Sequence, residues 1–329
     1  MSNIKHSVEE LIGNTPLLEL DSYEKAKGLK ARILLKVESM NILGSLKDRI
    51  AVSMIDALEK ETDIKPGDYL VEASSGNTVI ALAAIGRKRG YKVLAIVEQA
   101  TQERLDLLHA YGAETVDVAD CPEIRAGFGK LNDNYKFHDF LNDYFGQKGR
   151  EEGRKYFVTA QWANKANREV QYFTTGKEII RDTDGKVDVF IGGIGSGGSL
   201  RGVGEALREV NPNLEIIAID STSEEPDSLV GIHKIAGNPN FMLPVHVTEI
   251  EKPYDRTITV TKEDAYRAAN AVAKYEGIFF GITTGAAVHI ATQLAKQPKY
   301  EGKTIVTFAY DDVLKYLSTE ITNPEYLEA

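Results

Sequence analysis

The 329-residue sequence lacks the residues on which several classes of protein site depend. A single cysteine, Cys121, excludes an internal disulfide framework and a cysteine-rich metal site, and it favours a reducing cytoplasm. The six histidines show no paired spacing typical of metal ligands, so we predict no metal site. We therefore expect a chemistry that needs neither a metal ion nor a disulfide.

Long apolar runs and a surplus of basic residues are also missing. The apolar run at 79–85 is far shorter than the roughly 18 residues of a membrane-spanning helix. The first residues, MSNIKHSVEE, have neither the apolar core nor the cleavage site of a secretory leader, so we expect none. Lys and Arg number 39 against 49 for Asp and Glu, a net charge of −10. We expect no membrane partner and no nucleic-acid partner.

The apolar residues that are present occur in short β-branched runs that alternate with helical patterns. The predicted strands are 69–73, 92–97, 156–160, 187–192, 215–220 and 303–309, and the predicted helices are 103–111, 200–210, 263–276 and 286–297. Such alternation predicts an α/β fold with a parallel sheet. Residues 120–154 are polar, contain scattered aromatics and show no period, so we interpret them as a lid, an insertion or a long surface excursion.

The first of three turns of small residues follows the predicted strand 69–73. It reads Ser-Ser-Gly-Asn-Thr at 74–78 and precedes an apolar helical pattern. Free backbone N–H groups at a strand-to-helix turn bind anions, so this turn can hold a carboxylate. An ordinary turn with capping side chains is the alternative.

The second turn is rich in glycine and reads Gly-Gly-Ile-Gly-Ser-Gly-Gly-Ser at 192–199. So many glycines at a strand end indicate close approach of the backbone to a ligand, and a helix N-terminus there would favour phosphate. Gly193, Gly195 and Gly198 also match G-x-G-x-x-G, with Asp220 at the end of the next strand as a candidate ribose ligand. Phosphate binding, a dinucleotide site and a structural turn all stay open at this point.

A third turn and one lysine complete the candidate site. The turn 281–285, Gly-Ile-Thr-Thr-Gly, carries hydroxyls that can meet a polar ring atom or cap a helix. Lys47 follows a small-residue turn and begins an apolar-patterned segment, where burial would lower the pKa of its amine and make it nucleophilic. Most lysines are instead solvated surface charges. Together, the three turns and this lysine describe a pyridoxal phosphate site.

The order of these motifs resembles the cysteine synthase and cystathionine β-synthase family, the fold type II pyridoxal phosphate enzymes. The matching motifs span nearly the whole chain and lie at 12–17, 44–49, 75–78, 174–176, 195–199 and 276–285. The resemblance implies two domains, each with a twisted, mostly parallel sheet flanked by helices. The larger, cofactor-phosphate-binding domain would comprise residues 1–48 and 156–329, and the smaller, mobile substrate-loop domain residues 49–155.

The resemblance also implies a role for each matching residue. Lys47 would form the internal aldimine and then act as the general base. Asn77 would hydrogen-bond the ring hydroxyl of the cofactor, and Thr283 would face its pyridine nitrogen. The cofactor phosphate would be held by Gly195, Ser196, Gly197, Gly198 and Ser199. The α-carboxylate of the substrate would be bound by Ser74, Ser75, Thr78 and Gln161.

The activity implied by the resemblance is β-replacement on a serine- or cysteine-type amino acid through an α-aminoacrylate. A cysteine synthase, which turns O-acetylserine and sulfide into cysteine and acetate, is the expected form. Ser74 stands where the family has threonine and Trp162 enlarges an aromatic position, so the substrate stays open. The alternatives are cysteine-consuming, sulfide-producing elimination or replacement, including lanthionine or cystathionine formation, and, from another class, a nucleotide-dependent oxidoreductase using the glycines at 193–198.

Some further expectations concern partners and neighbouring residues. The resemblance implies a homodimer that binds an amino acid and a thiol or sulfide, with room for a partner's peptide tail in the active-site cleft. Asp227, His233 and Asn238 lie in or beside a family loop near the cofactor and receive no role. Asp311 and Asp312 follow the last predicted strand, and we interpret them as a solvated cap rather than as groups near the cofactor ring.

Overall fold

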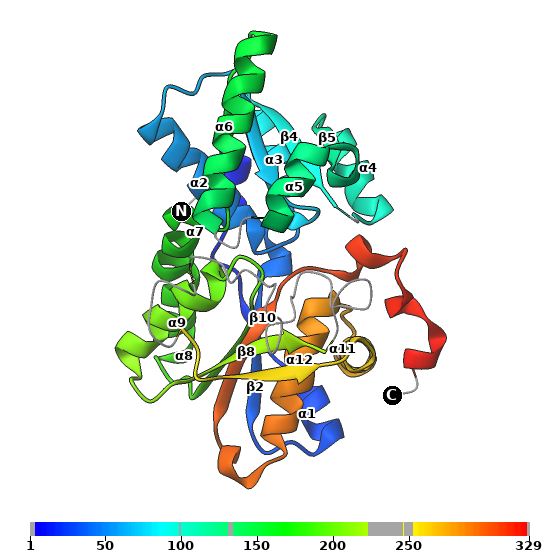
Figure 1. Ribbon diagram of the computed structural model, residues 1–329. Helices are drawn as coiled ribbons and strands as arrows, with labels where there is room; N and C mark the ends of the chain where they lie inside the picture. The colour runs from blue at the N-terminus through cyan, green and yellow to red at the C-terminus, as the bar shows by residue number, and fades with distance from the viewer. Residues whose placement is uncertain (1–3, 99, 131–133, 223–245, 247–252, 328–329) are drawn as a thin grey trace.

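The computed structural model describes residues 4–98, 100–130, 134–222, 246 and 253–327, and these ranges contain two sheets in two lobes (Figure 1). The six-stranded sheet has the order β1-β2-β10-β7-β8-β9, and the four-stranded sheet has the order β5-β4-β3-β6. All neighbouring strands are parallel except β1 and β2. The predicted α/β fold is confirmed.

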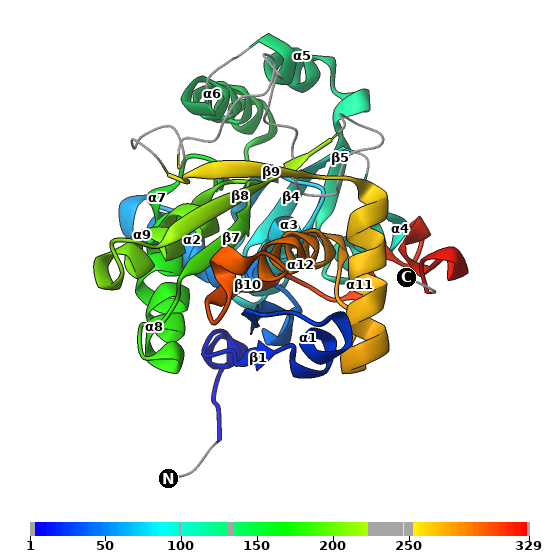
Figure 2. The ribbon, with the colours of Figure 1, turned by 90° about the horizontal axis from the view of Figure 1, so that it is seen from below.

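The larger sheet lies in the lower lobe of Figure 1. Its strands are β1 (Leu17–Glu19), β2 (Arg32–Val37), β7 (Val189–Gly193), β8 (Glu215–Ser221), β9 (Arg256–Val260) and β10 (Thr304–Ala309). Its helices are α1 (Asp21–Lys27), α8 (Lys177–Thr183), α9 (Gly198–Val210), α11 (Lys262–Glu276) and α12 (Ile282–Ala295). Figure 2 shows α8 and α9 on one side of this sheet and α1, α11 and α12 on the other. Every residue of β10 is buried, as expected for a central parallel strand covered on both faces.

The smaller sheet lies in the upper lobe of Figure 1. Its strands are β3 (Tyr69–Ala73), β4 (Lys92–Val97), β5 (Glu114–Asp117) and β6 (Tyr156–Val158). Its helices are α2 (Lys47–Glu61), α3 (Asn77–Lys88), α4 (Gln102–Ala110), α5 (Pro122–Lys130) and α6 (Asn134–Glu152). Alternate residues of β3 and β4 contribute to two different apolar clusters, so this sheet is also buried on both faces.

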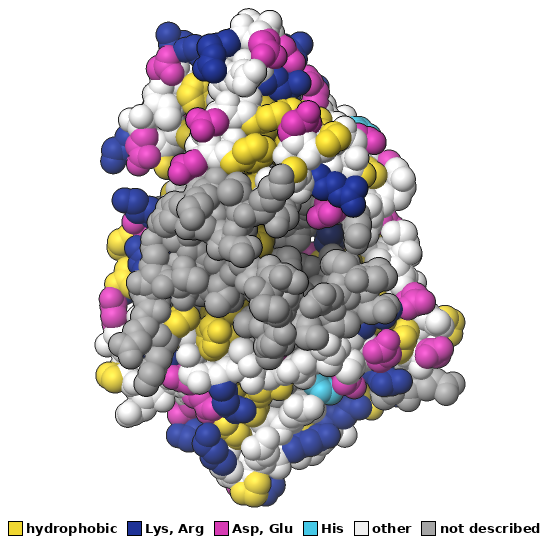
Figure 3. All heavy atoms as spheres, viewed as in Figure 1, with side chains coloured by type: hydrophobic (Ala, Val, Ile, Leu, Met, Phe, Trp, Pro, Cys, Tyr) yellow, Lys and Arg dark blue, Asp and Glu magenta, His cyan; other side chains and the backbone are white. Residues whose placement is uncertain are grey.

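Shorter helical turns complete the described chain. They are α7 (Lys165–Val170), the π-helical η4 (Gln171–Gly176), and the 3₁₀ turns η1 (Val8–Leu11), η2 (Glu38–Met40), η3 (Val118–Asp120), η5 (Pro298–Tyr300), η6 (Val313–Tyr316), η7 (Glu320–Thr322) and η8 (Pro324–Tyr326). Within the described ranges, no helix is both long and apolar enough to cross a bilayer. On the face shown in Figure 3, side chains of both charge signs are interspersed over both lobes.

Within the segment 120–154, residues 122–130 and 134–152 are helical (α5 and α6), which corrects the aperiodic interpretation drawn from the sequence. In α6, Leu141 and Phe145 are four residues apart and are both buried against the small sheet. Phe137, Phe140 and Tyr144 pack beside them at helical spacing. The charged and amide residues between these positions hid the period, although an aromatic stripe at i, i+3/i+4 and i+7/i+8 is the pattern of an amphipathic helix.

The fold brings together the turns that were singled out in the sequence. In parallel α/β sheets, ligands bind outside the carboxyl ends of the strands. The turn 74–78 follows β3, Gln161 comes shortly after β6, the turn 195–199 follows β7, and Asp311 comes just after β10. A ligand site is therefore expected at these strand ends.

Candidate active site

Lys47 is the first residue of α2 and follows a tight turn that begins at Asn41. Gly44 has φ +81°, a conformation that L side chains rarely adopt, and this lets the chain reverse before the helix. The Ser45 hydroxyl accepts a 3.1 Å hydrogen bond from the backbone N–H of Lys47. Burial lowers the pKa of the Lys47 amine to about 8, although the negative charge of Glu72 acts in the opposite direction. The nucleophilic lysine predicted from the sequence thus has a suitable environment.

Glu72 is a functional candidate that the sequence analysis missed. It is buried in β3, and burial raises its pKa to about 7. Its Oε2 accepts hydrogen bonds from the Thr159 hydroxyl and, at 3.0 Å, from the backbone N–H of Gln161. The only sequence signal was one carboxylate inside an otherwise apolar strand, and a carboxylate at such a position needs a specific partner.

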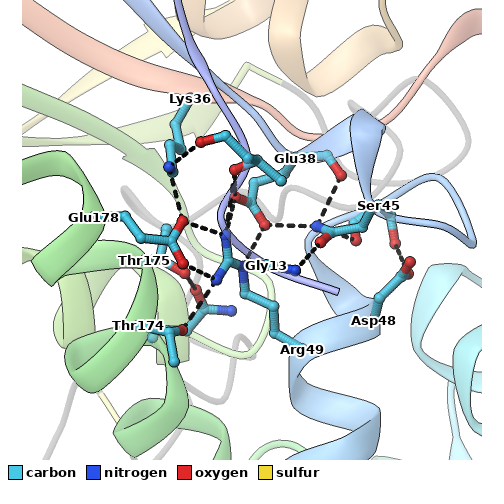
Figure 4. Close-up of polar contacts among 12 residues, drawn as sticks. Gly13, Lys36, Glu38, Ser45, Asp48, Arg49, Thr174, Thr175 and Glu178 are labelled. Carbon is cyan, nitrogen blue, oxygen red and sulfur yellow. Dashed lines mark hydrogen bonds and ion pairs between the residues drawn. The ribbon is translucent and has the colours of Figure 1, made fainter. Parts of the chain in front are cut away.

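A buried ionic network anchors α2 just beyond Lys47 (Figure 4). Arg49 Nε donates to Glu38 Oε2 at 2.8 Å, and Arg49 Nη1 donates to Glu178 Oε1 at 2.7 Å. Lys36 Nζ lies 2.8 Å from Glu178 Oε2. Burial alone would raise the pKa of Glu178, but hydrogen bonds and charge from Arg49 and Lys36 lower it to about 2. The network ties the start of α2 to β2, η2 and α8, so the lysine-bearing turn is held on several sides.

The turn 74–78 brings two predicted substrate-binding residues next to each other. The Thr78 hydroxyl donates a 2.7 Å hydrogen bond to Gln161 Oε1, and both side chains are buried. Ser74 Oγ accepts from the backbone N–H of Gly76 at 3.3 Å, which shapes the turn. Ser75 Oγ exchanges hydrogen bonds with the backbone of Glu98, so its hydroxyl joins the turn to the end of β4. Of the predicted carboxylate ligands, the Thr78 and Gln161 side chains are therefore directly linked.

The glycine-rich turn 195–199 connects β7 to the N-terminus of α9, where backbone N–H groups and the helix dipole favour an anion. Gly197 has φ +79°, and a Cβ on Gly198 would lie 2.3 Å from Asn167 Oδ1. Both positions thus require glycine, Gly197 because of its backbone conformation and Gly198 because of the Asn167 side chain. Ser196 and Ser199 are buried within it.

Asn167, another residue that the sequence analysis missed, joins this turn to the substrate side. Its Nδ2 donates to Ser196 Oγ at 2.9 Å and to the backbone oxygen of Gln161 at 2.7 Å. The buried His246 ring also lies 3.1 Å from that oxygen, measured from Nε2. A continuous hydrogen-bonded path therefore runs from Thr78 through Gln161 and Asn167 to Ser196.

Asn77 and Thr283 are the residues predicted to meet the cofactor ring. Asn77 Nδ2 donates to Asp311 Oδ2 at 2.7 Å. Thr283 is buried in the first turn of α12, and the neighbouring Thr284 accepts a hydrogen bond from the backbone N–H of Tyr310. Their predicted roles remain proposals.

Asp311 and Asp312 differ from each other, which corrects their joint interpretation as a solvated cap. Asp311 is fully buried, whereas Asp312 is half-buried and accepts from the backbone N–H of Leu314 at the start of η6. Asp227, His233 and Asn238 lie outside the described residues.

The residues at these strand ends fit pyridoxal phosphate. A lysine with a lowered pKa can react with the aldehyde, and the turn 195–199 leads into the N-terminus of α9, where backbone N–H groups suit a phosphate. Asn77 Oδ1 and Asp311 Oδ1 are buried polar atoms with no hydrogen-bond partner among the described residues. Unpaired buried polar atoms are rare in folded proteins, and a polar ligand bound here would supply their missing partners.

Comparison with known proteins decides the family. The pattern described as "Pyridoxal-phosphate dependent enzyme" matches residues 8–311. The chain belongs to this enzyme family. As a pyridoxal-phosphate dependent enzyme it uses that cofactor, and the match decides against the nucleotide-dependent oxidoreductase.

Similar proteins cover 95% or more of this pyridoxal-phosphate dependent enzyme. A cysteine synthase from Staphylococcus aureus (strain Mu50) is 38% identical over 324 residues, 96% of each chain. A hydrogen sulfide-producing enzyme from Fusobacterium nucleatum has 31% identity and a TM-score of 0.80, covering 95% of this chain and 100% of its own. A cysteine synthase from Entamoeba histolytica has 30% identity and a TM-score of 0.79, covering 100% of this chain and 97% of its own. The resemblance to the cysteine synthase family is confirmed.

Proposed function

We propose that the protein is a cysteine synthase, which replaces the acetoxy group of O-acetylserine by sulfide and releases cysteine and acetate. One arrangement carries the proposal. The negative charge of Glu72 acts to raise the pKa of Lys47, and Glu72 also accepts a hydrogen bond from the backbone N–H of Gln161. Gln161 in turn connects the 74–78 turn, through Thr78, to the 195–199 turn, through Asn167. The cysteine synthases of Staphylococcus aureus and Entamoeba histolytica support the choice of reaction.

The cofactor would be held at three points by this chain's own residues. Lys47 would bind its aldehyde carbon, residues Gly195, Ser196, Gly197, Gly198 and Ser199 would bind its phosphate, and Asn77 and Thr283 would meet its ring. When bound, the cofactor withdraws electrons and so stabilises negative charge at the Cα atom of the amino acid. A neutral threonine hydroxyl facing the pyridine nitrogen favours loss of the β-substituent over a long-lived carbanion.

The protein's part in the reaction is to bind the substrate and to move one proton. Because Gln161 Oε1 accepts from Thr78, the donating Nε2 group is the end of the amide that can bind the α-carboxylate. The N–H groups of the turn 74–78, with the Ser74 hydroxyl, would complete this subsite, whereas the Ser75 hydroxyl already donates to the backbone oxygen of Glu98. When its amine is not joined to the cofactor, Lys47 would take the Cα proton of the substrate. The lowered pKa of this amine leaves much of it neutral near pH 8. Movement of the smaller domain, proposed as residues 49–155 and sharing its sheet with β6, would then exclude water.

A spectroscopic titration tests the proposal. We expect the purified protein with pyridoxal phosphate to show a visible band that changes on addition of O-acetylserine and recovers on addition of sulfide, with cysteine and acetate formed in equal amounts. Lys47→Ala should abolish the band change and turnover, whereas Lys60→Ala, at an exposed position of the same helix, should leave both intact. A protein that binds the cofactor but leaves O-acetylserine unreacted would contradict the assignment.

Sulfide release from cysteine is the second candidate reaction. The similarity to the hydrogen sulfide-producing enzyme of Fusobacterium nucleatum favours it, as does Ser74, which has one methyl group less than the family's threonine. The same sample supplied with cysteine alone distinguishes the two reactions. Rapid sulfide release from cysteine, with no reaction of O-acetylserine, would assign the protein to this alternative.

The assembly and location are proposed on the family resemblance. We propose a homodimer in the cytoplasm that acts on small amino acids and a thiol or sulfide. Light scattering coupled to size-exclusion chromatography should give about twice the chain mass of 36.3 kDa. A single-chain mass at working concentration would contradict the dimer.

A further inference from the structure

Asp311 connects the two lobes at the candidate cofactor site. It follows β10 of the larger sheet, and its carboxylate is fully buried. Its Oδ2 accepts hydrogen bonds from Tyr316 OH at 2.6 Å and from Asn77 Nδ2 at 2.7 Å. Asn77 is the first residue of α3, which packs on the smaller sheet. A single oxygen of Asp311 therefore touches a residue that the proposed function places at the cofactor ring.

This contact determines which way the Asn77 amide faces. Asp311 Oδ2 acts as an acceptor, since it also receives the Tyr316 hydroxyl hydrogen, so it meets the donating Nδ2 end of the amide. Nδ2 carries a second hydrogen, and Oδ1 is buried with no partner among the described residues. If the amide were rotated by half a turn, two acceptor oxygens would face each other. The Asp311 carboxylate thus selects one of two amide orientations.

Asp311 is itself held in place by its surroundings. A Cβ on Gly281 would lie only 2.1 Å from Asp311 Oδ1, and the Gly281 N–H donates to the Asp311 backbone oxygen at 3.0 Å. The Arg104 guanidinium lies over the ring of Tyr316, 4.8 Å from its centroid. Burial raises the pKa of Asp311, and Tyr316, Arg104, Asn77 and Lys315 act against that rise. The carboxylate and its tyrosine partner thus form a fixed support behind Asn77.

We propose that Asp311 is a positioning residue that orients the Asn77 amide toward the cofactor ring, and that Tyr316 fixes Asp311 for this task. The inference rests on the proposed role of Asn77 in binding the ring hydroxyl. Neither Asp311 nor Tyr316 needs to touch the substrate. Their effect on the cofactor passes through Asn77.

A double-mutant cycle on the holoenzyme tests this coupling. Asp311→Asn and Tyr316→Phe are made alone and together with Asn77→Ala. Asp312→Asn, the same change one residue along at a half-buried helix cap, is the matched control. The measurements are the position of the visible band of the bound cofactor, its dissociation constant and the melting temperature.

We expect Asp311→Asn to shift the visible band and to weaken cofactor binding about tenfold, the effect of one lost hydrogen bond to a charged group. Tyr316→Phe should shift the band and weaken cofactor binding in the same direction, but by a smaller amount. If Asp311→Asn does not fold, Tyr316→Phe is used in its place. Asp312→Asn should leave the band unchanged. In the Asn77→Ala background, both Asp311→Asn and Tyr316→Phe should lose their effect on the band.

Two results would overturn the positioning role. One is an unchanged band in Asp311→Asn and Tyr316→Phe, and the other is an equal band shift with and without Asn77, which would show that Asp311 acts independently of it. A wild-type protein that binds no pyridoxal phosphate at all would instead contradict the proposed function itself. The outcomes of the two proposals are thus separate.

Discussion

The Thr78 hydroxyl donates a 2.7 Å hydrogen bond to Gln161 Oε1, joining the first turn of α3 to the segment after β6. Both side chains are buried, and the backbone oxygen of Gln161 is bonded in turn to Asn167. The bond fixes the amide of Gln161 with its donating end directed away from Thr78. The residues proposed to bind the substrate carboxylate and the cofactor phosphate are therefore joined by one hydrogen-bonded path.

Thr78→Val removes this bond while preserving the shape of the side chain. Gln161 Oε1 is then left unpaired and its amide can rotate, so we expect KM for the amino-acid substrate to rise about tenfold. Cofactor affinity should change less, because Asn167 still holds Ser196. Steady-state kinetics and a cofactor titration measure the two effects, with Thr62→Val at the exposed end of α2 as the control. An unchanged KM would show that Gln161 does not bind the carboxylate.

The lowered pKa of Lys47 predicts how cofactor capture depends on pH. Only the neutral amine attacks an aldehyde, and at pH 7 about a tenth of a group with pKa near 8 is neutral, against well under about 0.1% for an ordinary lysine. The rate of reconstitution of the apoprotein should rise with pH and level off above about pH 8. Stopped-flow absorbance measures it, with a blocked lysine amide in the same buffers as reference. A rate that keeps rising beyond pH 10, as for the reference, would contradict the lowered pKa.

Gly198→Ala tests the phosphate-binding turn. The added Cβ would lie 2.3 Å from Asn167 Oδ1, so Asn167 or the start of α9 must move. We expect cofactor affinity to fall at least about tenfold, because backbone N–H groups bind phosphate only in a precise arrangement. Fluorescence titration with pyridoxal phosphate measures the change. Gly146→Ala, within α6, should leave the affinity unchanged and raise helix stability by up to about 1 kcal/mol. If Gly198→Ala bound pyridoxal phosphate as tightly as the wild type, the turn 195–199 would not be part of the cofactor site.

The lowered pKa of Glu178 predicts that the protein loses stability in acid. Its pKa is about 2 in the folded protein against an ordinary value of 4.5, so its contribution is present above pH 4.5 and is lost as the pH falls through 4.5 toward 2. Glu178→Gln should lower the free energy of unfolding by about 1–3 kcal/mol at pH 7, since Arg49 and Lys36 lose a charged partner.

Urea denaturation at a series of pH values checks the Glu178 prediction. The difference between wild type and Glu178→Gln should shrink as the pH falls below 4.5. Glu61→Gln, at the exposed end of α2, serves as the control. A difference that stays constant with pH would show that the buried network of Figure 4 does not depend on the charge of Glu178.

Elements with a strong local pattern were predictable from the sequence. The strands 69–73 and 92–97 have the bounds of β3 and β4, because their apolar β-branched runs are buried on both faces and end at polar turns. The helix α6 was missed because its apolar stripe is interrupted by charged and amide residues. β2, 32–37, was also outside the predicted strands, although it pairs with β10 along its whole length.

Some residues of the candidate site could be predicted from the sequence, and others could not. Lys47 and the turn 195–199 lie in sequence patterns, and Asn77 and Gln161 in family-like motifs, that already indicate a role. Glu72, Asn167 and Asp311 do not, because an isolated Glu, Asn or Asp has the same local appearance whether it caps a helix or is buried at a ligand. Their significance comes from partners that are distant in the chain, such as the pair Asn77 and Asp311, 234 positions apart.

The sequence by itself determined the α/β class, through local periodicity, and the cofactor, through ordered motifs that resemble a known family; the same motifs supplied the residues proposed to surround that cofactor. The tertiary structure alone decided which polar groups are buried together, and therefore which pKa values shift and which amides are held in one orientation. Burial and hydrogen-bond geometry depend on neighbours from other strands and helices. The lowered pKa of Lys47 and the support of Asn77 by Asp311 are consequences of that packing.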